Sequence, residues 1–231
     1  MSIVKNAIIS AAGMGTRLGL NMPKCLLKFN GISIIEQIIL NFNKYGIKKF
    51  NIIINYKSQI IKSFLKESVN FKKNKITFFQ EKKPLGTAGG LSILKKSIKS
   101  DFILTNCDIL IKYDISKIYE YHRLNKNDLT LITFKKTNIL PYGNCLIDEF
   151  NNLKKIEEKP YSNFLINTGM YIINPSILNF LKNNQKININ ILIEKLIKSK
   201  KRVKTYQIDE EDWFDVGEWP QYYKTVESYN W

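Results

Sequence analysis

Apolar runs typical of strands alternate with segments of helical periodicity through the first half of the chain. Strands that alternate with helices of about a dozen residues form a mostly parallel sheet with helices on both faces. The pattern therefore predicts a doubly wound α/β fold here, with Ser33 and Glu36 spaced as a capping box and Thr87 opening a helix. Strands are predicted over residues 5–10, 50–55, 75–80 and 101–106, and helices over residues 33–45, 57–68 and 87–98.

The pattern changes beyond residue 110, where a mixed sheet is expected. The turn residues Asp148 to Asn152 lie between two apolar runs and predict a hairpin. Because no linker or repeat interrupts the sequence, residues 1–231 are predicted to form one domain with two halves, residues 1–110 and 111–231. Strands are predicted over residues 129–135, 144–148 and 169–173, and helices over residues 115–124, 176–182 and 188–199.

The chain is strongly basic, with a net charge of +16 from 36 Lys and Arg against 20 Asp and Glu. Only Arg17, Arg123 and Arg202 are arginines, whereas proteins that read nucleic acids favour Arg for bidentate contacts. The lysines accompany many Asn and Ile residues, which indicates a compositional bias. We therefore expect no nucleic-acid partner, although a basic nucleic-acid-binding module stays an alternative. Positive potential would attract polyanionic small molecules such as nucleoside triphosphates.

The apolar runs stop well short of the roughly 20 residues that a membrane helix needs. The first predicted strand begins within a few residues of Met1, which leaves no room for a signal peptide. The three cysteines are far apart, so they fit neither a disulfide framework nor a zinc site. We therefore expect a cytoplasmic protein without a membrane partner. His122 is the only histidine, which excludes a histidine triad, and its polar neighbours predict a surface position.

A loop of small residues follows the first predicted strand. Gly13 and Gly15 would let the backbone approach a phosphate chain, and Arg17 and Lys24 add cations downstream. The segment matches neither the Walker pattern nor G-x-G-x-x-G, since position 18 is Leu. The loop therefore predicts an anion-binding site of another kind.

The run from Gly13 to Leu18, with Pro23-Lys24 after it, resembles the hallmark of the sugar-phosphate nucleotidylyltransferases. The resemblance implies a Rossmann-like, GT-A-like α/β fold with a mostly parallel mixed sheet flanked by helices, in its short single-domain form. It also implies that Arg17 assists pyrophosphate departure and that Lys24 stabilises charge on the transferred phosphate. The residues implied to wrap the triphosphate are Ala11, Ala12, Gly13, Met14, Gly15 and Thr16.

A second motif, Pro84-Leu85-Gly86-Thr87-Ala88-Gly89, resembles the family's base-binding loop. The resemblance implies that Glu81 contacts the base edge and that Gly86 and Thr87 bind the nucleotide. A carboxylate only accepts hydrogen bonds, so Glu81 suits guanine or cytosine and thus GTP or CTP. A register slip would place Gln80 there instead and reopen the option of uracil or thymine.

Two aspartates are candidate metal ligands. Asp108 follows an apolar run and is expected at the carboxyl end of a central strand, where open α/β sheets bind ligands. Asp215, in Trp213-Phe214-Asp215-Val216-Gly217, resembles the family's second metal carboxylate. Mg²⁺ commonly takes one or two carboxylates together with phosphate oxygens, so Mg²⁺ is the expected cofactor.

Further motifs in the second half resemble the family's acceptor pocket. The resemblance implies that Glu158 holds acceptor hydroxyls and that Lys159 contacts and orients the acceptor phosphate. It assigns Gly143, Asn167 and Thr168 to the walls of the same pocket. Residues 1–110 are thus expected to bind the nucleotide and residues 111–231 the acceptor.

These motifs together predict an enzyme that joins a nucleoside triphosphate to a phosphomonoester, such as a sugar 1-phosphate. The products would be an NDP-activated donor, for surface or capsule polysaccharide synthesis, and pyrophosphate. One alternative is a cytidylyltransferase that acts on phosphocholine or phosphoglutamine. The others are the non-catalytic nucleic-acid-binding module and a relative that binds nucleotide without turnover.

Overall fold

The computed structural model describes residues 4–13, 22–68, 71 and 73–228. Within this part of the chain, a seven-stranded sheet has the order β12-β8-β11-β6-β1-β4-β5. β11 runs antiparallel to both its neighbours and the other neighbouring pairs are parallel, which confirms the predicted mixed, mostly parallel sheet. The strands are β1 (Asn6–Ala11), β4 (Lys49–Ile54), β5 (Lys75–Gln80), β6 (Phe102–Asn106), β8 (Leu129–Ile139), β11 (Tyr161–Ile173) and β12 (Val203–Ile208).

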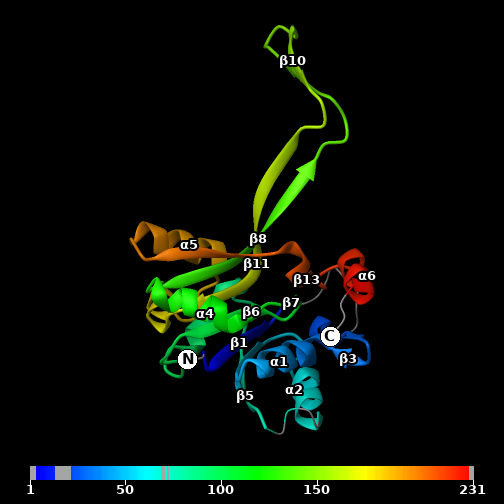
Figure 1. Cartoon of the computed structure of the whole chain (residues 1–231). Helices are drawn as coiled ribbons and strands as arrows, with labels where there is room; N and C mark the ends of the chain where they lie inside the picture. The colour runs from blue at the N-terminus through cyan, green and yellow to red at the C-terminus, as the bar shows by residue number, and fades with distance from the viewer. Residues whose placement is uncertain (1–3, 14–21, 69–70, 72, 229–231) are drawn as a thin grey trace.

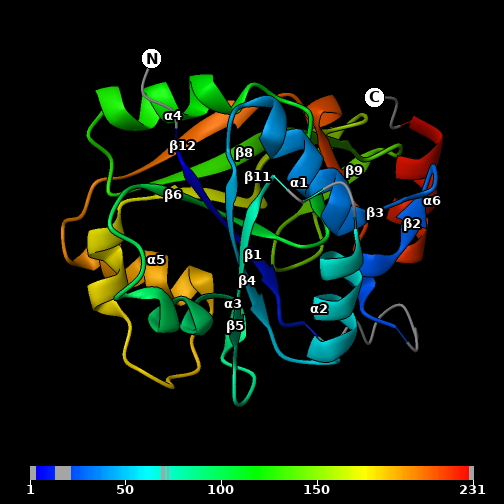
Figure 2. The same ribbon diagram turned by 90° about the horizontal axis from the view of Figure 1, so that it is seen from below.

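Helices cover both faces of this sheet, so that α4 and α5 lie on opposite sides of its strands (Figure 2). The alternation of side chains along β1 explains the two cores: Ala7 and Ile9 pack with α1, α2 and α4, whereas Ile8 packs with α5 on the other face. The helices are α1 (Ile34–Lys44), α2 (Ser58–Glu67), α3 (Gly86–Gly89), α4 (Ile115–Leu124), α5 (Ile189–Lys198) and α6 (Trp219–Ser228). None of those in the described ranges is long and apolar enough to span a membrane.

Two predicted helices are wrong in length or type. The helix expected over residues 87–98 is a single turn, α3, followed by the 3-10 helix η4 (Gly90–Leu94). The backbone N–H groups of Ala88 and Gly89 both donate to Ile187 O, so these groups are tied to another segment. The segment predicted as helix 176–182 is likewise a 3-10 helix, η5 (Pro175–Phe180).

Short elements that the periodicity did not reveal complete the fold. The 3-10 helix η2 (Lys24–Leu26) precedes the small pair β2 (Lys28–Phe29) and β3 (Ile32–Ser33). β7 (Ile109–Ile111) pairs antiparallel with β13 (Trp213–Asp215), and η6 (Glu210–Asp212) leads into β13. The capping box of α1 is confirmed, because Ser33 N donates to Glu36 Oε2 over 3.0 Å and Glu36 N donates to Ser33 Oγ.

A long extension leaves the body of the molecule at β8 and β11 (Figure 1). These strands pair continuously from Thr133 opposite Asn167 out to Ile139 opposite Tyr161. The predicted hairpin at residues 148–152 caps the extension, between β9 (Asn144–Ile147) and β10 (Leu153–Glu157). We call residues 135–165 the arm.

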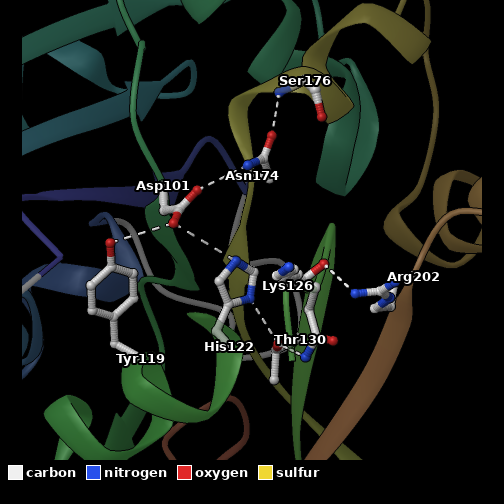
Figure 3. Close-up of polar contacts among 9 residues, drawn as sticks. Asp101, Tyr119, His122, Lys126, Thr130, Asn174, Ser176 and Arg202 are labelled. Atoms are coloured by element: carbon white, nitrogen blue, oxygen red, sulfur yellow. Dashed lines mark hydrogen bonds and ion pairs between the residues drawn. The ribbon is translucent and has the colours of Figure 1, made fainter. Parts of the chain in front are cut away.

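The predicted surface position of His122 is wrong, since the residue is 1% exposed. Figure 3 shows His122 between α4, β6 and β8, with Nδ1 at 2.8 Å from Thr130 Oγ1. Nε2 lies 4.0 Å from Asp101 Oδ2, and Asp101 also accepts hydrogen bonds from Tyr119 and Asn174. Burial lowers the pKa of His122, against the opposing effect of the Asp101 and Asp128 charges.

Candidate functional site

A cavity of about 400 Å³ opens where the central parallel strands end. Ser10 of β1 pairs with Asn106 of β6, so these strand ends lie side by side, and Cys107 N donates to Ser10 O. Ligands bind at the carboxyl ends of strands in open α/β sheets, so this is the expected place for a site. The lining residues are Ser10, Ala11, Ala12, Gly13, Pro23, Lys24, Cys25, Glu81, Pro84, Leu85, Gly86, Thr87, Asn106, Cys107, Asp108 and Gly217.

A cation and a carboxylate meet at this cavity. Lys24 Nζ lies 2.7 Å from Asp108 Oδ2, and the side chains are 10% and 22% exposed. η2 holds Lys24, and Asp108 lies between the ends of β6 and β7. The second oxygen, Asp108 Oδ1, is buried and accepts no hydrogen bond from any residue that the structure describes. This oxygen can therefore accept an additional ligand.

Asp215 is brought to the same place by the pairing of β13 with β7. It lies opposite Ile109, and Val216 N donates to Asp108 O over 3.0 Å. Gly217 N donates to Asp215 Oδ1 over 2.6 Å, and a Cβ on Gly217 would lie 3.0 Å from Lys24 Nζ. The absence of a side chain at position 217 therefore lets Lys24 and Asp215 approach each other.

Glu81 enters the cavity from the end of β5. Its side chain is buried, and Oε2 accepts a hydrogen bond from Leu85 N over 3.3 Å. Burial raises the pKa of Glu81, and the Leu85 N–H opposes this effect. Gln80 is exposed and its Oε1 accepts a hydrogen bond from Lys62 Nζ, so the structure places Glu81, not Gln80, on the cavity.

The glycine loop after Glu81 is held by the segment before α5. Gly86 has φ +77°, and a Cβ there would lie 2.7 Å from Ile187 O. Thr87 does not cap its own helix as predicted, since the cap of α3 is Leu85 and makes no side-chain hydrogen bond. Thr87 Oγ1 instead accepts a hydrogen bond from Ile189 N at the start of α5, over 2.8 Å. Both halves of the chain therefore shape this side of the cavity.

Comparison with known protein families identifies the family of this chain. The sequence matches the model of the nucleotidyl transferase family over residues 6–230. The chain belongs to this family. The membership and the fold predicted from the glycine loop and the strand pattern are confirmed.

Individual nucleotidyl transferases show the same relationship. The chain is 30% identical over 222 residues to D-glycero-alpha-D-manno-heptose 1-phosphate guanylyltransferase of Campylobacter jejuni, covering 94% of this chain and 96% of that protein. It is 31% identical over 182 residues to mannose-1-phosphate guanylyltransferase 1 of Arabidopsis thaliana, covering 74% of this chain and 50% of that protein. The chain thus spans half the length of this plant relative.

A solved structure resembles the whole chain. HddC from Yersinia pseudotuberculosis complexed with GMP-PN superposes with a TM-score of 0.75 and 25% sequence identity, and the match covers 98% of this chain and 100% of that chain. The solved inositol-1-phosphate CTP transferase of T. maritima shares the fold, with a TM-score of 0.73 and 17% identity over 98% of this chain and 96% of that chain.

The residues predicted to bind the acceptor in this nucleotidyl transferase divide into two groups. Asn167 and Thr168 lie where β11 enters the body, and Thr168 O accepts a hydrogen bond from Trp213 Nε1. The next residue, Gly169, has φ +84°, and a Cβ there would lie 2.8 Å from Asn106 Nδ2 at the cavity. Asn167 and Thr168 are therefore close to the site without lining the cavity.

Gly143, Glu158 and Lys159 form the second group and lie on the arm. A Cβ on Gly143 would lie 3.2 Å from Glu158 Oε2, so the arm brings these predicted residues together. None of the three lines the cavity, and the arm extends away from the body (Figure 1). The structure therefore does not bring this group to the nucleotide side of the site.

Several predicted phosphate-binding residues lie outside the described residues: Met14, Gly15, Thr16 and Arg17. Of the remaining loop, Ala11, Ala12 and Gly13 line the cavity. Cys25, Leu85 and Asn106 also line it, although the sequence interpretation assigned them no role. Each is a direct neighbour of a predicted motif residue or belongs to the motif, which is the signal that could have identified it.

The residues present fit a divalent metal ion. Asp108 Oδ1 is buried without a hydrogen bond from the described residues, and the backbone of Asp215 lies opposite Ile109, the residue after Asp108. No group of three or more His, Cys, Asp or Glu side chains suited to a metal occurs in the ranges that the structure describes. Such a donor set suits Mg²⁺, which binds through one or two carboxylates and completes its shell with phosphate oxygens and water.

Proposed function

We propose that this chain transfers a nucleoside monophosphate from a nucleoside triphosphate to a sugar 1-phosphate, with GTP as the preferred donor. The observation that carries the proposal is the Lys24–Asp108 pair, 2.7 Å long, on a cavity at the carboxyl ends of the central strands. The two relatives described above bear the name guanylyltransferase, and one solved relative is complexed with GMP-PN. These names support guanine over cytosine.

The proposed reaction needs no nucleophilic side chain. An oxygen of the acceptor phosphate attacks the α-phosphorus, a new P–O bond forms, and the bond to the β-phosphate oxygen breaks as pyrophosphate leaves. Lys24 is positioned to stabilise negative charge on the transferred phosphate, and we assign Arg17 to the departing pyrophosphate. Mg²⁺ held by Asp108 and Asp215 would neutralise phosphate charge when bound.

Glu81 is the proposed determinant of base choice. Its buried carboxylate can accept hydrogen bonds from guanine N1–H and N2–H. Ala11, Ala12 and Gly13 present backbone beside the cavity, which suits the close approach of a phosphate chain. We assign Gly143, Glu158, Lys159, Asn167 and Thr168 to the acceptor.

The test is pyrophosphate release with Mg²⁺ across GTP, CTP, UTP, ATP and dTTP and a panel of sugar 1-phosphates. Asp108→Asn should lower the rate at least about 100-fold, because it removes one charge from the proposed metal site. The control is Glu67→Gln, which removes one negative charge from an exposed position on α2 and should leave the rate unchanged. If the folded wild-type protein released no pyrophosphate with any combination of nucleotide and acceptor, the proposed activity would be refuted.

Two alternatives have distinct outcomes in the same set of measurements. A cytidylyltransferase acting on phosphocholine or phosphoglutamine would release pyrophosphate with CTP and those acceptors only. A basic nucleic-acid-binding module would bind DNA or RNA with a steep dependence on salt, and Asp108→Asn would leave that binding unchanged. A role in surface polysaccharide synthesis and a cytoplasmic location remain predictions, since neither follows from the geometry.

A further inference from the structure

Three backbone N–H groups of α3 donate to the segment that precedes α5. Ala88 N and Gly89 N both donate to Ile187 O, over 3.0 Å and 3.1 Å. Thr87 N donates to Asn188 Oδ1 over 3.4 Å. The first N–H groups of a helix have no partner within that helix and are available for a ligand. Here they are satisfied by the second half of the chain, so the loop meets the cavity with other groups.

Two further hydrogen bonds join the same segments. Ile187 N donates to Leu85 O over 2.9 Å, and Ile189 N donates to Thr87 Oγ1 over 2.8 Å. Ile189 is the first residue of α5, and the cap of that helix, Asn188, makes no side-chain hydrogen bond to it. Thr87 thus accepts a hydrogen bond from α5, while Asn188 accepts one from α3. The starts of the two helices therefore satisfy each other.

The two segments are also packed closely. Gly86 has a φ of +77°, and a Cβ there would lie 2.6 Å from Asn188 Oδ1 and 2.7 Å from Ile187 O. Ala88 and Ile187 are 0% and 6% exposed, and both belong to the core between α5 and the sheet. The position of the loop is therefore set by the segment before α5 and not by the residues of the loop alone.

This support extends to the carboxylate that is proposed to contact the base. Leu85 O accepts the hydrogen bond from Ile187 N, and Leu85 N donates to Glu81 Oε2 over 3.3 Å. Thr87 lines the same cavity, and because its Oγ1 accepts from Ile189 N, its hydroxyl hydrogen can be donated to a bound nucleotide. A shift at the start of α5 would therefore move Thr87 and Glu81 together.

We propose that the start of α5 positions the base-binding loop, so that Asn188 and the N–H group of Ile189 are positioning groups for the choice of nucleotide. The inference rests on the proposed function, because it concerns how Glu81 and Thr87 meet the base. Neither Asn188 nor Ile189 is among the described residues that line the cavity, so both act through the loop. The half of the chain that is predicted to bind the acceptor thereby also supports the nucleotide side.

The decisive variant is Ile189→Pro, which removes the N–H group and leaves α5 in place. Proline suits the first position of a helix and requires an extended residue before it, as Asn188 is with φ −89° and ψ 158°. The matched variant Ile189→Ala loses the same side-chain contacts but keeps the N–H group. In titration calorimetry with GTP and Mg²⁺, without acceptor, the Kd of Ile189→Pro should exceed that of Ile189→Ala about 3-fold or more.

A second set of variants separates positioning from a general loss of structure. Asn188→Ala removes the acceptor of Thr87 N and should weaken GTP binding, whereas Asn188→Asp keeps an acceptor and should bind GTP as the wild-type protein does. Asn190→Ala, at an exposed position on α5, is the control that should change nothing. In pyrophosphate release, Asn188→Ala should raise KM for GTP and leave kcat and the KM of the acceptor unchanged. Partial unfolding would instead lower kcat alone.

Amide hydrogen exchange of the protein without nucleotide tests the support of the loop directly. Residues 87–89 should exchange faster in Ile189→Pro than in Ile189→Ala, because the loop is no longer held at Thr87. Equal exchange and equal GTP binding in these two variants would overturn the inference, and the proposed function would stand if the wild-type protein released pyrophosphate. A wild-type protein that bound no nucleoside triphosphate would overturn the proposed function and, with it, the role of α5 in the choice of nucleotide.

Discussion

Glu81 shows how the neighbourhood of one side chain determines what it can bind. Gly90 lies against Glu81 Oε1, and a Cβ there would collide with that oxygen. The carboxylate therefore occupies space that only a glycine leaves free. Burial raises its pKa, and the hydrogen bond from Leu85 N holds one of its oxygens in place.

Replacing Glu81 with glutamine should change the choice of nucleotide. An amide offers guanine one acceptor and one donor group, so it loses part of the match to N1–H and N2–H. We expect kcat/KM with GTP to fall by about 10- to 100-fold, and the ratio between GTP and UTP to fall with it. Steady-state kinetics with GTP, CTP and UTP measure both quantities.

The control for this substitution is a change at Gln80, the residue before Glu81. Gln80→Ala removes an exposed side chain that bonds to Lys62, on the outer side of the same strand end. It should leave the nucleotide preference unchanged. If Glu81→Gln used GTP as well as the wild-type protein does, Glu81 would not read the base.

Sequence patterns predicted individual residues well where a strand end fixed their position. Glu81 and Asp108 both follow apolar runs, and both line the cavity. The predicted position of His122 was wrong because the nearby residues Glu120 and Arg123 are polar. A helical period instead groups it with Ile115, Ile118 and Tyr119 on the buried face of α4, and this spacing is the signal that outweighs local polarity.

At the scale of elements, His122 links α4 to the sheet. Thr130 Oγ1 accepts a hydrogen bond from Asn127 Nδ2 over 2.9 Å and lies 2.8 Å from His122 Nδ1 (Figure 3). The Thr130 hydroxyl hydrogen can therefore be donated to Nδ1, which leaves the ring proton on Nε2, toward Asp101. The neutral form of the ring suits this pocket.

The stability of the fold should therefore depend on pH through His122. Burial lowers its pKa from 6.5 in the folded chain, so above about pH 6.5 neither state carries the proton. As the pH falls below 6.5, the unfolded chain gains a proton that the folded chain does not, and the free energy of unfolding decreases. The decrease stops once the pH reaches the pKa of His122 in the folded chain. It amounts to about 1.4 kcal/mol for each unit by which folding lowers this pKa.

Urea unfolding between pH 7.5 and pH 5 measures this dependence. The raised pKa of Glu81 acts on stability in the opposite direction, so the contribution of His122 is obtained as the difference between the wild-type protein and a variant without the histidine. His122→Gln keeps an amide for hydrogen bonding but removes the titration, so its stability should vary less over the same range. A wild-type stability that changed with pH in the same way as that of His122→Gln would contradict the lowered pKa of His122.

Helices and strands could be predicted from the sequence when enough of their residues showed the periodicity of a helix or a strand. α1, α2, α4 and α5 lie within a residue or two of the predicted ranges, because each has a full apolar stripe. The prediction was wrong for α3 and η4, since Gly86 and Gly89 let this segment pack tightly against residues 185–188 and Gly90 lies against Glu81. β7 and β13 have three residues each, too few to show any alternation.

At the scale of the whole molecule, the arm is the feature that local patterns could not place. The strands predicted over residues 129–135 and 169–173 correspond to the buried parts of β8 and β11 only. The outer parts are just as strand-like in sequence, but their apolar residues face solvent in a single chain. Periodicity identifies a face that must be covered and does not identify the molecule that covers it.

The net charge of +16 is the other property of the whole molecule with a measurable consequence. Like charges repel more strongly in the compact state, so a large net charge destabilises the fold at low ionic strength. Lys49 of β4 lies directly opposite Lys75 of β5, and both are exposed at the start of adjacent strands. Facing like charges in a sheet are destabilising.

Salt should therefore raise the melting temperature of this protein. The Debye length shortens from about 30 Å at 0.01 M to about 10 Å at 0.1 M, which screens charges on different elements from each other. If screening contributes about 1 kcal/mol, the melting temperature should rise by about 2–4 °C for a chain of this size.

Lys75→Glu should raise the melting temperature further at low salt, because repulsion from Lys49 becomes attraction. Lys99→Glu, an exposed control outside the sheet, makes the same change in net charge without that contact and should raise it less. Equal effects of the two variants at low salt would assign the repulsion to the molecule as a whole, and a melting temperature that fell with KCl would refute it.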